Sequence, residues 1–289
     1  MKQRMLWLLA TVMTLLGSHV TMAQHIVSDS IYIPPTMLPK ATVYLPAPPD
    51  SVSPEFVDDL LQYQWGKSMR ATERGEQAYR ESYNMAPSMC NVMAQVLGLD
   101  SIGFTNTPAL SRLLIKSFVT GAVSVLEAKW AHGRTRPFVM MNEAFQTQYE
   151  TPENLKWYES YPSGHTASGW ATALAFAEMW PALQDTILRR GYQYGYNRLI
   201  VGYHWFTDIE ATRQLSSALV ARLHADPQFL DLMAAARAEY LEKTGDTTPV
   251  DSDKTMARPS GRSYRLDGTP ATAQTRGIVI QDNRKTLRK

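Results

Sequence analysis

Residues 110–126, LSRLLIKSFVTGAVSVL, carry the pattern that decides the fold class. Their apolar side chains recur every three or four positions, which is typical of one face of an α-helix. We expect this helix to end near Gly133, because glycine commonly follows the last helical turn. The charged side chains Arg112, Lys116 and Glu127 lie along it, so the segment is predicted to be a core helix and not a membrane span.

Helical spacing also appears on both sides of this segment. It begins at Phe56, and an alanine-rich apolar helix is predicted over Thr166–Trp180, where Pro181 would stop it. Another amphipathic helix is predicted over Trp205–His224. Strand signals are sparse, so the predicted fold class is all-α, a helical bundle.

The start of the chain has the features of a secretory signal peptide. Lys2 and Arg4 give a positive start, residues 6–16 form an uncharged apolar run, and small residues up to Ala23 offer a cleavage point. A membrane anchor is the alternative, but the run is shorter than the roughly 20 apolar residues that cross a bilayer. We therefore expect residues 1–23 to be removed and the mature protein to be periplasmic or secreted, with no integral membrane segment.

Composition divides the mature chain into three parts. Residues 24–55 are rich in proline and are expected to form an extended arm, since proline fits neither a helix interior nor a central strand. Residues 56–248 are expected to form the helical domain that carries the motifs described below. Residues 249–289 are polar and basic and are expected to form a flexible tail, with a weak strand signal at residues 277–280.

Charge and cysteine content exclude several classes of protein. The 29 basic and 27 acidic residues leave a net charge of +2, without the strong basic excess of a nucleic-acid-binding protein. Cys90 is the single cysteine, so an intrachain disulfide and a cysteine-built zinc or iron–sulfur site are both excluded. We expect no nucleic-acid partner.

Three motifs follow one another within the helical domain. They contain Lys129 and Arg136, then Ser163, Gly164 and His165, and then Arg198, His204 and Asp208. Lys129, Arg136 and Arg198 supply three cations for a phosphate group, whose charge spreads over three oxygens in the transition state of its transfer. Arginine suits such a group because its planar fork gives paired hydrogen bonds.

The middle and last motifs predict how such a site would work. Ser163 and Gly164 directly precede a predicted helix, whose N-terminal N–H groups bind anions. His204 and Asp208 are four residues apart, which places them on one face of a helix. There the carboxylate would fix the histidine tautomer and make the other ring nitrogen a better nucleophile. His165 would donate a proton to the leaving oxygen.

Each motif taken singly has an ordinary structural explanation. A lone basic residue is usually a solvated charge, a lone histidine is usually structural, and Pro-Ser-Gly-His alone can be a turn with a helix cap. The three motifs in order favour a functional site. A zinc site built from His132, His165 and His204 is the alternative, but neighbouring cations would repel a metal ion and the His-Glu-x-x-His pattern is missing. We therefore expect no metal and no cofactor.

These motifs resemble the signature of the type-2 phosphatidic acid phosphatase superfamily, which also contains vanadium haloperoxidases. Within it they are most similar to the bacterial class A non-specific acid phosphatases, through residues 160–166 (SYPSGHT), 202–205 (GYHW) and 70–75 (RATERG). The resemblance covers roughly residues 40–240. It implies an all-α, secreted, metal-free phosphomonoesterase of broad specificity that assembles as a homo-oligomer.

The resemblance also implies a role for each site residue. His204 would be the nucleophile that becomes a phosphohistidine, His165 the general acid, and Asp208 the group that orients His204. The phosphate would be held by Lys129, Arg136, Ser163, the Gly164 amide and Arg198. Asn197 departs from the family pattern, which usually has serine there, although asparagine also forms hydrogen bonds.

Three other functions stay open on the sequence. A vanadium haloperoxidase would use the same anion pocket, although the small size and the class A motifs argue against it. A lipid phosphatase of this superfamily would be built on transmembrane helices, and a non-catalytic phosphate-binding protein would not need His204 together with Asp208. The favoured function is an acid phosphatase that acts on a small-molecule phosphomonoester.

Overall fold

The computed structural model describes residues 30–82, 85–144, 159–245, 263–265, 270–272, 276–281 and 284–288. The predicted signal peptide, residues 1–23, lies outside the described residues. The chain divides into two compact units, Met1–Asp246 and Thr247–Lys289. The elements described in the first unit are η1 (Pro35–Met37), α3 (Ala41–Tyr44), α4 (Phe56–Met69), α5 (Glu73–Glu81), α6 (Met85–Leu97), α7 (Pro108–Ser124), α8 (Leu126–His132), α9 (Pro137–Met140), α11 (Gly164–Met179), η2 (Pro181–Leu183), α12 (Gln184–Ile200), α13 (Phe206–Leu223) and α14 (Pro227–Thr244).

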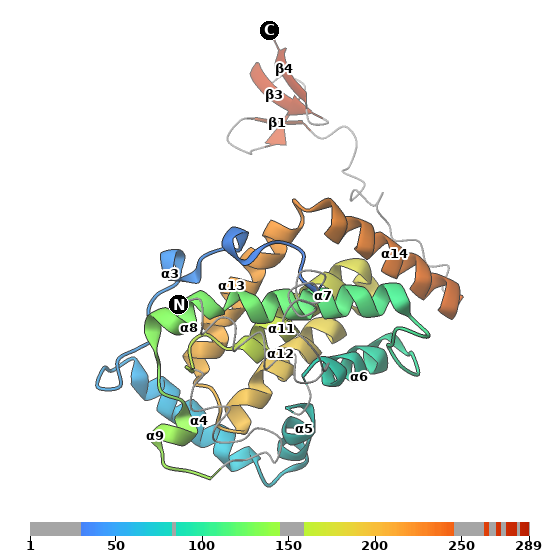
Figure 1. Cartoon of the computed structure of the whole chain (residues 1–289). Coiled ribbons are helices and arrows are strands. Elements are labelled where there is room, and N and C mark those ends of the chain that lie inside the picture. Colours follow the sequence, from blue (N-terminus) through green and yellow to red (C-terminus); the bar gives the residue numbers. More distant parts are fainter. Residues whose placement is uncertain are drawn as a thin grey trace. The chain divides into compact units, whose positions relative to one another are not determined.

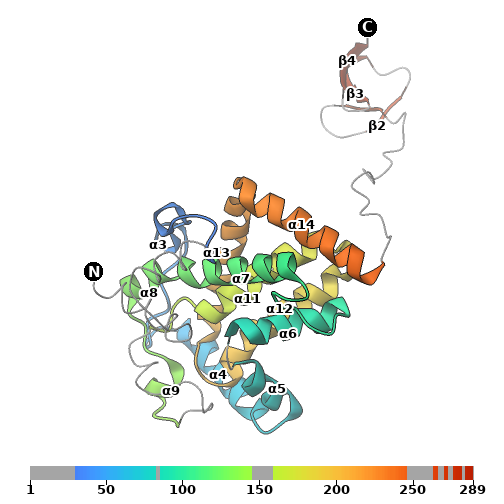
Figure 2. The same cartoon turned by 45° about the vertical axis from the view of Figure 1, so that its right-hand side comes forward.

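Helix α11 lies at the centre of the first unit (Figure 1). It packs against α7, α12 and α13, and α14 in turn lies against α7 (Figure 2). Small residues allow the close approach, because a Cβ atom at Gly121 of α7 would lie 2.7 Å from the Ala167 carbonyl oxygen of α11. The main apolar core lies among α6, α7, α11 and α14. The predicted all-α helical bundle is confirmed for this unit.

Helices α7 and α8 occupy the stretch for which one continuous helix was predicted. They are separated by Val125, whose φ and ψ are −87° and −12°. Gly133 follows α8 in the left-handed region with a φ of 58°, so the predicted end of the helical stretch is confirmed.

One described segment, Pro108–Met140, is long and apolar enough to cross a membrane. However, 61% of its most apolar window is buried inside the protein, as in the core helix of a soluble domain. The lack of an integral membrane segment stays a prediction.

The proline-rich segment is not a separate extended arm. Tyr32 and Ile33 are buried in the main core, and the Tyr32 N–H donates to Thr120 Oγ1 of α7 at 3.2 Å. The short helical turns η1 and α3 also lie within this segment. The predicted arm is therefore wrong for residues 30–55, because apolar side chains of this segment, Tyr32, Ile33 and Leu38, gain by packing into the core.

The second unit contains a small sheet where a flexible tail was expected. Its strands are β1 (Ser263–Arg265), β2 (Pro270–Ala271), β3 (Gly277–Gln281) and β4 (Arg284–Arg288). They pair antiparallel in the order β2-β1-β3-β4. The strand signal at residues 277–280 is confirmed as β3, and the tail prediction is wrong for these strands. The physical reason is that the β-branched run of β3 finds hydrogen-bonding partners on both sides.

Candidate active site

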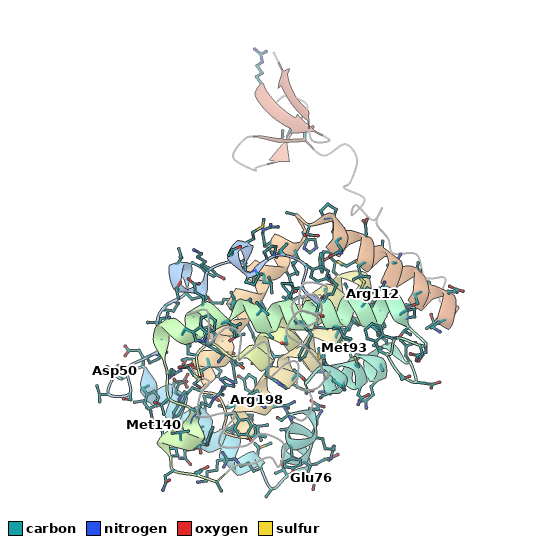
Figure 3. The ribbon with its side chains drawn as sticks, viewed as in Figure 1. Asp50, Glu76, Met93, Arg112, Met140 and Arg198 are labelled. Carbon is teal, nitrogen blue, oxygen red and sulfur yellow. The ribbon has the colours of Figure 1, made fainter. Side chains whose placement is uncertain are left out.

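A tight turn between α12 and α13 carries His204. Gly202 in this turn has a φ of 78°, a conformation that favours glycine, and a Cβ atom there would lie 2.6 Å from Arg70 Nη2, so this guanidinium would have to shift. The N–H groups of Tyr203 and His204 then donate to the Arg198 carbonyl, at 2.9 and 3.2 Å. The turn therefore holds His204 beside the last turn of α12, where Arg198 is buried within the bundle (Figure 3).

Asp208 meets His204 in a different way from the one expected. Because α13 begins at Phe206, His204 lies ahead of the helix, and the prediction that both residues share one helix face is wrong. Asp208 instead sits in the first turn, where its Oδ2 accepts the Trp205 N–H at 2.8 Å, as a capping carboxylate does. The same oxygen lies 3.3 Å from His204 Nδ1. The helix start, rather than its face, brings the pair together.

The second ring nitrogen of His204 faces a cation. His204 Nε2 lies 3.1 Å from Arg136 Nη1. A guanidinium can only donate, so Nε2 is the acceptor and Nδ1 carries the proton that points to Asp208. Burial lowers the pKa of His204 well below its ordinary value, and Arg136 and Lys129 lower it further. The ring is therefore held neutral, with a lone pair on Nε2.

Three buried cations from separate elements act electrostatically on the His204 ring. Lys129 of α8 donates to the Glu159 carbonyl at 2.5 Å, and Arg136, which precedes α9, donates to the Tyr203 carbonyl at 2.8 Å. The Arg198 guanidinium stacks over the Tyr203 ring, 4.4 Å from its centroid. Burial lowers the pKa of Lys129 well below its ordinary value, and Arg136 lowers it further. A phosphate dianion placed among these groups would favour the charged amine.

The middle motif forms the start of α11. Ser163 is the N-cap, and its Oγ accepts the Thr166 N–H at 3.2 Å, so α11 begins at Gly164, two residues earlier than expected. The Ser163 N–H is itself bonded to Thr212 Oγ1 at 2.7 Å. A Cβ atom at Gly164 would make only an ordinary 3.6 Å contact with Val125. The cap uses the Thr166 N–H, whereas the N–H groups of Gly164 and His165 precede the first intrahelical bonds, as the donors of a helix-start anion site do.

His165 lies in this first turn and is buried. Neither of its ring nitrogens has a hydrogen-bond partner among the described residues. Its ring stacks on Tyr194, with the two ring centroids 4.0 Å apart and an interplanar angle of 9°. Burial lowers the pKa of His165 well below its ordinary value, and Arg198 and His204 lower it further.

Sequence reasoning missed the group that holds Asp208. Arg134 Nη1 donates to Asp208 Oδ1 at 2.6 Å, and Arg134 Nη2 donates to Asp59 of α4. Ser160 Oγ donates to Asp208 Oδ2 at 2.5 Å. Arg134 and Ser160 lie inside or beside the recognised motifs, so the sequence offered a reason to include them in the site. It offered none for Asp59, because only the fold brings α4 next to Arg134.

Asn197, the position that departs from the family pattern, is fully buried. Its Nδ2 donates to Glu81 Oε2 at 2.7 Å and so ties α12 to α5. The asparagine therefore braces the helix that carries Arg198.

Among the described residues, no group of three or more His, Cys, Asp or Glu side chains is arranged to hold a metal ion. His132, a member of the alternative zinc set, packs edge-on against the Tyr161 ring at a centroid distance of 5.1 Å.

The fold and the site define a class: helical proteins in which two buried histidines lie within electrostatic reach of buried lysine and arginine side chains. Comparison with known proteins narrows this class. The PAP2 superfamily matches residues 108–230. The chain belongs to this superfamily and, within it, to the family of the bacterial non-specific acid phosphatases, so the resemblance drawn from the motifs is confirmed.

Three relatives illustrate the similarity. The non-specific acid phosphatase of Providencia stuartii is 36% identical over 213 residues, which are 73% of this chain and 85% of the relative. The non-specific acid phosphatase of Salmonella typhimurium is 32% identical over 213 residues, 73% of this chain and 84% of the relative. The acid phosphatase of Zymomonas mobilis is 33% identical over 211 residues, 72% of this chain and 79% of the relative.

A solved structure was also matched, the crystal structure of a bacterial vanadium-dependent iodoperoxidase. It aligns with a TM-score of 0.44 and 16% sequence identity, and the match covers 67% of this chain. The chain spans 58% of the length of that structure.

Proposed function

We propose that the protein is an acid phosphatase that hydrolyses small-molecule phosphate monoesters of broad type through a phosphohistidine on His204, without a metal ion. Its family membership supports the class, that of the phosphoric monoester hydrolases. The observation that carries the mechanism is the His204 tautomer: Nδ1 is turned to Asp208 and the Nε2 lone pair to the cations.

In the first step the His204 Nε2 lone pair attacks phosphorus. The P–N bond forms, the P–O ester bond breaks, and the leaving oxygen takes a proton from protonated His165. Because Arg136 Nη1 contacts Nε2, the guanidinium has to exchange this contact for a phosphate oxygen as the substrate enters. Arg136, which contacts the nucleophilic nitrogen in the free enzyme, thus donates to the phosphoryl group when substrate is bound.

The cations and the helix start stabilise the transferred group. Lys129, Arg136 and Arg198 oppose the charge on the equatorial oxygens, together with Ser163 and the Gly164 amide. Asp208 keeps Nδ1 protonated and stabilises the positive charge that develops on the ring.

In the second step water attacks the phosphohistidine. His165, neutral after the first step, accepts a proton from this water, and the P–N bond breaks to return the lone pair to Nε2. Inorganic phosphate leaves, and His165 is again the protonated acid that the next cycle needs.

The pKa shifts fit a reaction at acid pH. His204 has to be neutral to attack, and its lowered pKa keeps it neutral as the pH falls. His165 has to be protonated to act, and its lowered pKa confines the protonated form to acid solution. Bound phosphate opposes the second shift by favouring a cation beside it.

Trapping the intermediate tests this proposal. Quenching turnover of labelled p-nitrophenyl phosphate without acid should leave label on the wild type and none on His204→Ala. His224→Ala is the matched control, because this histidine lies at the end of α13 and pairs with Glu178 at the surface. Label on His165, or substantial turnover by His204→Ala, would contradict the assignment.

Independence of metal is tested separately. Activity should survive exhaustive treatment with EDTA, since the charges that stabilise phosphate are side chains. Loss of activity that zinc or magnesium restores would contradict this part of the proposal.

Export and assembly are also proposed. A signal peptide ending near Ala23 would place the enzyme in the periplasm or outside the cell. The homo-oligomer is what the resemblance to the family implies. Mass spectrometry of the exported protein should give an N-terminus near Gln24, and light scattering should give a mass above that of one chain.

A further inference from the structure

The orientation of the buried His165 ring calls for an explanation. Its residue is 3% exposed, and neither Nδ1 nor Nε2 has a hydrogen-bond partner among the described residues. Rotation about χ2 is broad for an imidazole unless packing restricts it. A proton donor that turns freely would seldom point at the leaving oxygen, so another contact has to set the ring plane.

That contact is the parallel stack on Tyr194. The two rings lie 4.0 Å apart with an angle of 9° between their planes. Tyr194 comes from α12 and is fully buried, so the ring pair joins α12 to the first turn of α11. Stacked rings can slide little without losing contact, which restricts the His165 ring to one plane.

A glycine on α11 leaves the space that the Tyr194 ring occupies. Gly169 lies one turn after His165, and a Cβ atom there would lie 2.3 Å from Tyr194 Cδ1 and 3.0 Å from Cε1. Any other residue at 169 would therefore displace the tyrosine ring. The glycine lets the ring lie flat against the helix that carries His165.

The stack also acts on the charge of His165. In the part of the chain that the structure describes, Arg198 of α12 and His204 ahead of α13 act on its charge, and both disfavour its protonated form, as burial does. The negative face of an aromatic ring has the opposite effect, because it attracts a cation. Burial raises the pKa of the Tyr194 hydroxyl, so the ring stays neutral and acts through its face.

We propose that Tyr194 is a positioning residue for the leaving-group proton: it fixes the plane of the His165 ring and stabilises its protonated form. This inference rests on the proposed function, in which His165 is the general acid. The need for the proton differs between substrates, since p-nitrophenolate leaves readily without one and an alkoxide does not.

The experiment compares p-nitrophenyl phosphate with n-butyl phosphate in two variants of the full chain. Tyr194→Leu removes the ring, and we expect kcat/KM for n-butyl phosphate to fall about five- to thirty-fold more than for p-nitrophenyl phosphate, the rate equivalent of a desolvated cation–π contact. The alkaline limb of the n-butyl phosphate profile should also move to lower pH. Tyr194→Phe keeps the ring, so it should stay within about two-fold of wild type for both substrates.

Two controls separate a packing defect from the proposed role. Tyr196→Leu changes the same residue type two positions along α12, where the ring stacks on Tyr192 and not on His165, and should leave the substrate ratio unchanged. Tyr194→Met fills the same space with a flexible side chain and replaces Tyr194→Leu if that variant folds poorly. It should show the same larger loss of kcat/KM for n-butyl phosphate than for p-nitrophenyl phosphate.

The outcomes are distinct. An equal loss on both substrates, or an unchanged ratio with an unchanged pH profile, overturns the role of Tyr194. His165→Ala is measured in parallel: if it does not separate the substrates either, the general-acid assignment itself is wrong. If His165→Ala separates them and the Tyr194 variants do not, only the present inference is lost.

Discussion

Replacing Arg134 tests whether a buried charge network holds Asp208 in place. In Arg134→Met, the carboxylates of Asp59 and Asp208 lose the cation that they share, while both remain fully buried. Removing one partner of a buried ion pair costs about 3–5 kcal/mol. Because this arginine serves two carboxylates, we expect about 4–5 kcal/mol, the upper part of that range. For a unit of this size, that loss lowers Tm by about 8–20 °C.

Two further variants make the test specific. Arg134→Lys keeps the charge but lacks the planar fork, so it can satisfy one carboxylate well and should lose about 1.5–3 kcal/mol. Asp59→Asn in the Arg134→Met background removes one unpaired charge, and its amide oxygen can still accept the Thr207 N–H that Asp59 accepts at 2.8 Å. The double variant should recover at least about 1 kcal/mol relative to Arg134→Met.

The assay is urea unfolding followed by circular dichroism, with kcat for p-nitrophenyl phosphate measured where each variant is folded. Asp208 keeps its contacts with Ser160 and the Trp205 N–H, so Arg134→Met should lose less kcat than Asp208→Asn. A stability loss below about 1 kcal/mol, the value of a surface pair, would refute the reasoning. So would a double variant no more stable than Arg134→Met.

Three other perturbations have defined outcomes. Gly202→Ala should cost about 1–2 kcal/mol from its left-handed backbone and should lower kcat, whereas Gly245→Ala, with a φ of 64° and open space around it, should share the strain but keep kcat. Vanadate should inhibit competitively and bind at least about a hundred-fold tighter than substrate, as transition-state analogues do, and indifference to vanadate would indicate another mechanism. The rate for alkyl phosphates should fall as the pH rises to neutrality and beyond, because His165, whose pKa is lowered, then loses the proton that it has to donate. A rate that keeps rising above about pH 7 would contradict its role as the acid.

Much of the fold followed from local patterns. The helical spacing of residues 110–126 needs no knowledge of the rest of the chain, and the left-handed Gly133 ends the helical stretch where the sequence indicated. The errors came where packing outweighed local preference. The prolines before Phe56 argued for an extended arm, but Tyr32 and Ile33 are buried in the core. Polar composition argued for a tail after residue 248, but strand pairing joins β3 to two neighbours.

For the candidate site too, the sequence indicated some features and only the tertiary structure decided others. Residue type and order alone indicated the two histidines, the three cations and the capped turn, because the chemistry of a phosphate group demands those side chains. Only the tertiary structure decided how they meet: His204 and Asp208 come together across a helix start, and Arg134 joins Asp208 to Asp59 from a helix far away in the chain. It also decided that Tyr194 lies flat on His165. A sequence encodes which groups can react, whereas distance, burial and the direction of a lone pair depend on contacts between segments that no local pattern specifies.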